Sequence, residues 1–172
     1  GRGSVALIGG EAGIGNTTLA AELRSAAEAR AFSVFWGRTP EAAWAGPYAP
    51  WIEALAALDG DSPALFQTAD DRSAEDRQAQ IHDRVLSQIS TAVQRKPALL
   101  VLDDFHWAQP APLDLLRHIA FSTARCQLLI AGTYRARAAA QHLPQCATLA
   151  RSRYAAKVLG TTPTALDGTH LQ

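Results

Sequence analysis

The sequence predicts an α/β protein of three layers, in which helices cover both faces of a parallel sheet of about five strands. Short apolar runs alternate along the chain with segments whose apolar residues recur every three or four positions, the spacing of one helix face. The runs are apolar almost throughout, which is typical of strands buried on both faces of a parallel sheet. A glycine-rich turn at residues 10–15 joins the first run to the first helical segment.

The first strand is predicted at residues 4–9, where Val-Ala-Leu-Ile forms the apolar run, and the first helix at residues 16–30. The apolar face of this helix is expected to consist of Leu19, Leu23, Ala26 and Ala27. A short aromatic strand is predicted next, at residues 33–37. The segment 38–50, rich in proline and aromatic residues, is expected to form an irregular loop.

A short helix is predicted at residues 50–58, followed by a turn at 59–62. Its inward-facing residues are expected to be Trp51, Leu55 and Leu58. A longer helix is predicted at residues 74–94, and Pro97 lies just beyond it. The apolar residues of this helix are spaced by four: Ile81, Val85, Ile89 and Val93.

Buried strands are predicted at residues 98–102 and 127–132, on either side of a helix that begins at Pro110. The apolar residues of that helix include Leu113, Leu116 and Ile119. Residues 136–156 are expected to be helical and 156–159 to form the fifth strand. One domain is therefore predicted at residues 1–160, and a tail rich in threonine, glycine and proline at 161–172 is expected to be disordered.

The composition is that of a soluble globular chain without a strong electrostatic preference. Lysine and arginine number 16, as do aspartate and glutamate, so the net charge is zero. A zero net charge gives no excess of positive charge for binding nucleic acid or an anionic membrane. No apolar run is long enough to span a bilayer. We expect a cytoplasmic protein with no direct nucleic-acid or membrane binding, in which the isolated Cys126 and Cys146 are reduced thiols.

Residues 10–17 read Gly-Glu-Ala-Gly-Ile-Gly-Asn-Thr and match the phosphate-binding pattern G-x-x-x-x-G-K-[ST] in every position but one. Glycines let the backbone turn tightly and direct several N–H groups to one point, and the following helix presents its positive end there. Thr17 is expected to ligate Mg²⁺. Asn16 replaces the lysine, and the lost charge weakens binding by on the order of tenfold to a thousandfold.

A second motif follows the strand predicted at residues 98–102, which ends in two carboxylates. Asp103 is expected to hold Mg²⁺ through water, and Asp104 to orient or deprotonate the attacking water. Acids often simply end a strand, and in isolation this pattern favours that interpretation. Its position after a nearly complete phosphate-binding loop, in the same alternating pattern, favours the metal site. Thr17 and Asp103 are then expected on neighbouring strand ends, within about 7 Å of each other and close enough to share one Mg²⁺.

A third segment, Leu-Leu-Ile-Ala-Gly-Thr-Tyr-Arg at residues 128–135, would bring polar groups to the γ-phosphate edge. Thr133 and Arg135 are the candidates for such a sensor. A solvated strand end explains the same residues equally well, so both interpretations stay open.

Together, residues 10–17, 100–110 and 132–135 resemble the AAA/STAND-type ATPase domain of large ATP-binding LuxR-type transcriptional regulators and of some multidomain adenylate cyclases and kinases. The aromatic and proline-rich residues 37–51 resemble the same domain, so the resemblance covers most of the chain. It implies a P-loop NTPase fold in which the strand ending at Arg135 lies between the Walker A and Walker B strands. His106 and Trp107 match the extension of the Walker B motif.

The resemblance also implies ATP or ADP and Mg²⁺ as cofactors. The implied nucleotide-binding residues are Gly10, Gly13, Gly15, Asn16, Thr17 and Thr18. The implied metal ligands are Thr17 and Asp103, and the implied catalytic residues are Asp104 and Arg135. The lid, winged-helix segment and effector of the family are not recognisable, so the chain is expected to be a fragment of a longer regulator.

Three functional hypotheses remain open. The first is a nucleotide-dependent switch module of a signalling or transcriptional regulator, in which ATP acts as a conformational latch. The second is a non-binding pseudo-ATPase that serves as a scaffold or is a truncated remnant. The third is an active ATPase in which Arg38 or Arg135 replaces the lost lysine.

Overall fold

The apolar runs of the sequence become the strands of one parallel sheet. The computed structural model describes residues 3–40, 46–59, 62–68, 73–105, 110–135 and 156–159. The strands are β1 (Ser4–Gly10), β2 (Ser33–Arg38), β3 (Ala98–Asp103), β4 (Leu128–Arg135) and β5 (Ala156–Leu159). Their order is β2-β3-β4-β1-β5, and each paired strand runs parallel to its neighbour. The predicted five-stranded parallel sheet is confirmed, and β4 lies between β1 and β3 as the resemblance implied.

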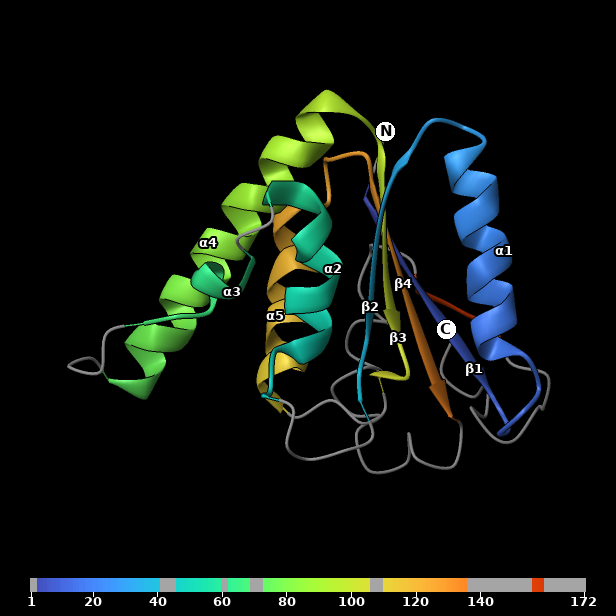
Figure 1. Cartoon of the computed structure of the whole chain (residues 1–172), viewed down its shortest axis with the longest axis horizontal. Coiled ribbons are helices and arrows are strands. Elements are labelled where there is room, and N and C mark those ends of the chain that lie inside the picture. Colours follow the sequence, from blue (N-terminus) through green and yellow to red (C-terminus); the bar gives the residue numbers. More distant parts are fainter. Residues whose placement is uncertain are drawn as a thin grey trace, which may run out of the picture.

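Helices cover both faces of this sheet, which confirms the three-layer α/β/α architecture. The helix α1 (Asn16–Glu28) packs on one face, while α2, α4 and α5 lie on the other (Figure 1). The helices of that second face are α2 (Ala49–Asp59), α3 (Ser62–Leu65), α4 (Ala74–Arg95) and α5 (Pro110–Ser122). The larger part of the apolar core therefore lies between the sheet and this group of helices.

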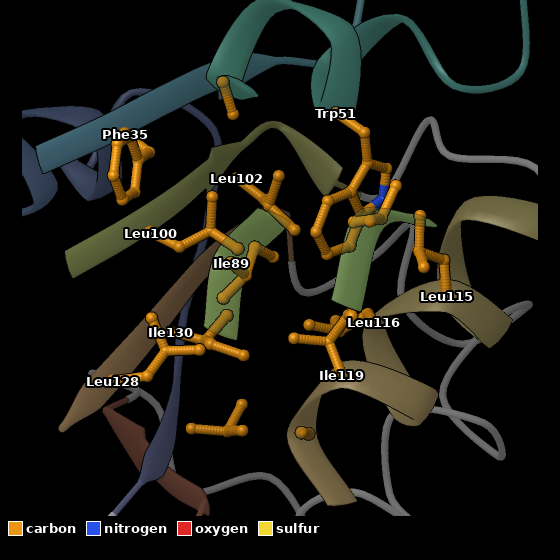
Figure 2. Packing of buried hydrophobic residues seen from close by; sticks show 14 of the residues in the cluster. Phe35, Trp51, Ile89, Leu100, Leu102, Leu115, Leu116, Ile119, Leu128 and Ile130 are labelled. Atoms are coloured by element: carbon orange, nitrogen blue, oxygen red, sulfur yellow. The ribbon is translucent and has the colours of Figure 1, made fainter. Parts of the chain in front are cut away.

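The strand β3 contributes side chains to the apolar core on each face of the sheet. Its side chains alternate between the two faces of the sheet, because successive residues of a strand point in opposite directions. Leu100 packs with the second-face helices, as seen in Figure 2, whereas Leu99 packs on the α1 side. The largest side chains of the second-face core include Trp51, Leu55, Ile89, Leu115, Leu116, Ile119 and Ile130. The indole N–H of Trp51 donates to the carbonyl of Pro112 at 3.3 Å and so joins α2 to α5.

The helix α4 follows the sequence prediction closely. Its N-cap, Ser73, accepts a hydrogen bond from the Asp76 backbone N–H at 3.1 Å, which satisfies one of the donors left open in a first helical turn. The predicted apolar positions are all buried: Ile81, Val85, Ile89 and Val93. The four-residue spacing was therefore sufficient to identify the inner face.

The prediction for α1 was wrong in two details. The helix ends at Glu28, and Leu19 is 45% exposed whereas Ala20 is buried. The rest of the predicted face is in part confirmed, because Ala27 is buried and Leu23 packs against the core. Ala20 and Ala27 are seven positions apart, which is two helical turns, so they lie on the same face. Leu19 precedes Ala20 by one position, a rotation of about 100° around the helix axis, so it points away from the sheet.

Other boundaries differ from the prediction by a few residues. The strand β4 runs to Arg135, beyond the end that its apolar run predicted at residue 132 and as the resemblance implied, and β3 includes Asp103. A short helix, α3, begins at Ser62, where a turn was expected. The fifth strand at residues 156–159 is confirmed.

Several predictions concern residues outside the described ranges. These are the helix at 136–156 apart from its last residue, the tail at 161–172, and His106, Trp107 and Cys146. Within the described ranges, Cys126 is a free, half-buried thiol. Among the helices that the structure describes, none combines the length and the apolar character needed to cross a membrane.

Candidate functional site

The predicted site residues gather at the carboxyl edge of the sheet. The strands β1, β2, β3 and β4 end there, and the connection from β1 to α1 lies at the same edge (Figure 1). In the strand register Gly10 is paired with Arg135, and Arg38 with Asp103. In open parallel α/β sheets this edge is where ligands bind.

The glycine-rich loop has the backbone geometry that the sequence predicts. Gly13 and Gly15 have φ angles of 80° and 100°, in the left-handed region that favours glycine. Gly15 is the N-cap of α1 and no side chain caps this end, so the helix begins at Asn16 as expected. Uncapped N–H groups and the helix dipole favour an anion at such an end, while phosphate binding itself stays a prediction.

The side chain of Asn16 turns back across the loop toward β4. Its Nδ2 donates to the backbone carbonyl of Tyr134 at 3.1 Å. A Cβ placed on Gly10 would lie 2.8 Å from Asn16 Oδ1, so the amide lies directly over the start of the loop. The ring of Tyr134 lies against Gly9 in the same way. The residue in the lysine position therefore joins the loop to the neighbouring strand.

Asp103 is the centre of the site. Its side chain is completely buried, and Oδ1 accepts hydrogen bonds from the hydroxyls of Thr17 at 3.1 Å and Thr133 at 2.6 Å. Its Oδ2 accepts from Arg38 Nε at 3.2 Å and Nη2 at 3.0 Å. Both carboxylate oxygens thus have protein partners, as a buried charge requires.

The predicted proximity of Thr17 and Asp103 is confirmed by this hydrogen bond, but the expected geometry was wrong in one respect. The two residues were placed on neighbouring strand ends. Thr17 lies in the first turn of α1, and β4 separates β1 from β3. The contact thus joins the first turn of α1 to the end of β3.

Arg38 is the residue whose role the sequence did not reveal. It was considered only as a substitute for the lost lysine, yet its guanidinium pairs with Asp103. Its backbone N–H donates to Glu53 Oε2 at 2.8 Å, and the N–H of the next residue, Thr39, donates to the Asp103 carbonyl at 2.9 Å. Arg38 ends β2 as Asp103 ends β3, and this shared position was the signal that could have identified the pair.

Thr133 connects the carboxylate of Asp103 to the backbone of Asp104. Its hydroxyl donates to Asp103 and accepts the backbone N–H of Asp104 at 2.8 Å. Thr133 is 1% exposed, so the interpretation of a solvated strand end does not apply to it. Asp104 is partly buried and has a φ of 54°, a left-handed conformation uncommon outside glycine. Such strained positions often occur at functional sites.

The remaining predicted residues lie around this centre. Arg135 is exposed and is paired in register with Gly10, so it flanks the start of the loop. Thr18 follows Thr17 in the first turn of α1. Within the described residues no cluster of three or more histidine, cysteine or acidic side chains could hold a metal ion. The predicted Mg²⁺ pair consists of one hydroxyl and one carboxylate, and these hard oxygen donors are of the kind that Mg²⁺ prefers.

Known proteins share this sequence pattern and fold. The family model of the AAA ATPase domain matches residues 1–131. An uncharacterized protein of Rhizobium meliloti (strain 1021) is 29% identical, over 78% of this chain and 16% of that protein. The ORC2 protein of Aeropyrum pernix, whose structure was solved in ADPNP–ADP complexes, is similar with a TM-score of 0.55 at 16% identity. That match covers 92% of this chain and 41% of the ORC2 chain, and it shows a shared fold.

Proposed function

Because the chain belongs to the AAA ATPase domain family, we propose that it binds ATP or ADP at residues 10–17 and acts as a switch module of a signalling or transcriptional regulator. The observation that carries this proposal is the joint geometry of the loop and the buried carboxylate. The left-handed Gly13 and Gly15 open the start of α1, and Thr17 contacts Asp103. A glycine-rich loop, a hydroxyl and a strand-end acid in contact are the parts that P-loop NTPases use on phosphates.

The nucleotide would be held mainly by backbone groups. The first N–H groups of α1 and the glycine loop supply donors for phosphate oxygens, and Asn16 contributes its N–H without a side-chain charge. If Mg²⁺ enters with the nucleotide, Thr17 and Asp103 are the residues that would hold it. The ORC2 structure with ADPNP and ADP supports a nucleotide as the ligand class for this fold.

Any hydrolysis would depend on Asp104, the acid proposed to orient water, and on Arg135 as a charge beside the transferred phosphate. The missing lysine charge predicts that turnover is weak, so binding is the primary activity in this proposal. The chain spans 16% of the Rhizobium meliloti relative and 41% of the ORC2 chain. A lid, an effector and other partner domains, together with a cytoplasmic location, are part of the proposal.

The alternative is a pseudo-ATPase that binds no nucleotide. One observation favours it: polar side chains of the site already form hydrogen bonds within the protein. Asn16 bonds to β4, and Thr17 bonds to Asp103. A nucleotide would have to compete with these contacts without the usual lysine.

Titration calorimetry with ADP, ATP and adenosine tests the proposal. We expect ADP and ATP to bind and adenosine to bind much more weakly, because the backbone donors contact phosphates. A variant with Gly13→Val, which strains a left-handed position, should lose the phosphate-dependent part of the affinity. Gly46→Val, at an open position without a left-handed φ, is the matched control. Equal affinity for ATP and adenosine, or none for either, would favour the pseudo-ATPase.

A further inference from the structure

We infer that Arg38 is the built-in cation of this site, so that nucleotide binding does not require Mg²⁺ and any Mg²⁺ must compete with the Arg38 guanidinium for Asp103. This inference rests on the proposed function only where nucleotide is concerned. The competition between metal ion and guanidinium is a property of the protein alone and is tested separately.

The charge of Asp103 is already balanced within the protein. This carboxylate is fully buried, and one of its oxygens is bonded twice to the same guanidinium, at 3.2 and 3.0 Å. Hydroxyls of Thr17 and Thr133 occupy the other oxygen. A single negative charge is thus already paired with a single positive charge. A divalent cation that binds Asp103 would therefore have to displace the guanidinium or share the carboxylate with it.

The backbone of Arg38 is fixed in place by the elements around it. Register pairing places it opposite Asp103, and its backbone N–H is bound by Glu53 at 2.8 Å. A Cβ on Gly37 would clash with the backbone of Pro50, so α2 packs directly on this end of β2. The guanidinium therefore extends from a fixed backbone position.

Another ion pair of the same chain differs from the pair of Arg38 and Asp103 in the burial of its carboxylate. Arg117 pairs with Asp114 at 3.3 Å, and the two arginine side chains are similarly exposed, at 53% for Arg117 and 56% for Arg38. Their partners differ, because Asp114 is 37% exposed and Asp103 is not exposed at all. Exposed pairs contribute little, whereas a buried carboxylate that loses its partner is left uncompensated. Arg117 is therefore a matched control for Arg38.

The first experiment uses no nucleotide. Mn²⁺, a probe for Mg²⁺ sites, is titrated and followed by electron paramagnetic resonance with the wild-type protein and with Arg38→Gln, Arg38→Lys and Arg117→Gln. We expect Arg38→Gln to bind Mn²⁺ at least about tenfold more tightly than wild type, because removing one adjacent positive charge restores the negative site. Arg117→Gln should match wild type, and Arg38→Lys should stay close to it because it keeps the charge.

A thermal unfolding series gives a second readout. At constant ionic strength, millimolar Mg²⁺ should raise the Tm of Arg38→Gln and leave the wild type and Arg117→Gln unchanged. If Arg38→Gln does not fold even with Mg²⁺, the wild-type titration still decides. Tight Mn²⁺ binding by the wild type would overturn the inference, and weak binding would support it.

The second experiment measures ADP affinity with Mg²⁺ and with EDTA. The wild type should give values within about threefold of each other, while Arg38→Gln should bind at least about tenfold more weakly in EDTA and regain affinity with Mg²⁺. Wild-type ADP binding that disappears in EDTA would contradict the inference. Absence of ADP binding under every condition would contradict the proposed function and leave the Mn²⁺ result to decide the role of Arg38.

Discussion

The Asn16 side chain donates a hydrogen bond to the backbone carbonyl of Tyr134, so the residue in the lysine position joins the glycine-rich loop to β4. A lysine there supplies a charge for the β- and γ-phosphates, whereas this amide supplies a contact within the protein. Both side chains have a donor at their tip, but only the ammonium carries a charge. The substitution therefore changes what the position contributes, from ligand binding to loop anchoring.

The first prediction follows from this exchange. Asn16→Lys should raise ATP affinity by at least about tenfold, because it restores a charge-assisted contact on the β- and γ-phosphates. Adenosine affinity should not change, since adenosine has no phosphate. Any hydrolysis should rise with ATP affinity and disappear again on Asp104→Asn. Parallel titrations of both ligands and a phosphate-release assay give the measurement.

The control for this variant is Gln94→Lys, which adds the same charge at an exposed position of α4. If Gln94→Lys raises ATP affinity equally, the effect comes from net charge and not from the loop. Unchanged ATP affinity in Asn16→Lys would favour the pseudo-ATPase.

The second prediction concerns Thr133, which bonds to Asp103 and to the N–H of Asp104. Thr133→Val keeps the shape but removes both contacts in a buried place, so we expect a loss of roughly 1–3 kcal/mol in the free energy of unfolding. Urea denaturation measures it. Thr91→Val on α4 removes an exposed hydroxyl that bonds to the Ser87 carbonyl and should change stability by less than about 0.5 kcal/mol. Equal losses in the two variants would contradict the connecting role of Thr133.

The glycine-rich loop and the contact of Asn16 with Tyr134 show what the sequence could and could not predict. The glycine spacing predicted the loop, because left-handed backbone there depends on local residue type. The spacing of Ile81, Val85 and Ile89 likewise predicted the buried face of α4. The contact between Asn16 and Tyr134 was not predictable, because it depends on strand order and register over 118 positions of the chain.

The same distinction explains the wrong placement of Leu19 in the inner face of α1 and the missed role of Arg38. Leu19 is more apolar than Ala20, yet Ala20 is buried, because the distance between helix and sheet decides which side chain fits. Arg38 and Asp103 come together only through the register of β2 with β3. Hydropathy and motif spacing carry no information on the distance between helix and sheet or on the register of two strands.

The third prediction is a gain in stability at the end of α1. Ala31 has a φ of 59°, and the Phe32 N–H donates to the Ala27 carbonyl at 3.0 Å, the pattern of a helix that ends in a left-handed residue. Ala31→Gly should stabilise the protein by about 0.5–1 kcal/mol, because relief of the left-handed strain exceeds the entropy that glycine adds to the unfolded chain. Thermal denaturation reports the difference.

The matched control is Ala21→Gly, an exposed position inside the same helix. There glycine relieves no strain and should cost about 1 kcal/mol. A destabilised Ala31→Gly would show that the left-handed backbone carries no cost at that position.

The fourth prediction concerns pH and the contact between α4 and α5. The rings of His82 and His118 are 5.1 Å apart, and burial lowers the pKa of His82 below its usual 6.5, with the charge of His118 adding to this effect. The nearby Asp114 and Asp83 raise this pKa, and Arg117 lowers it. Folding thus favours the neutral imidazole, so the unfolded chain takes up the proton first as the pH falls.

The stabilising contribution of neutral His82 is therefore complete above pH 6.5 and is lost as the pH falls below it. His82→Gln should reduce the loss of unfolding free energy between pH about 7.5 and about 5.5. Ser87→His, which adds an exposed imidazole on the same helix, should leave the wild-type pH dependence unchanged. An identical pH dependence in wild type and His82→Gln would refute the assignment.

The close approach of Gly37 to the backbone of Pro50 has a mechanical consequence. Main chain rests on main chain there, so no flexible side chain can absorb a displacement between β2 and α2. A push on α2 would be transmitted rigidly to the end of β2 one residue further on, where the Arg38 guanidinium is attached. A displacement of α2 would therefore change the position of the Arg38 guanidinium relative to Asp103.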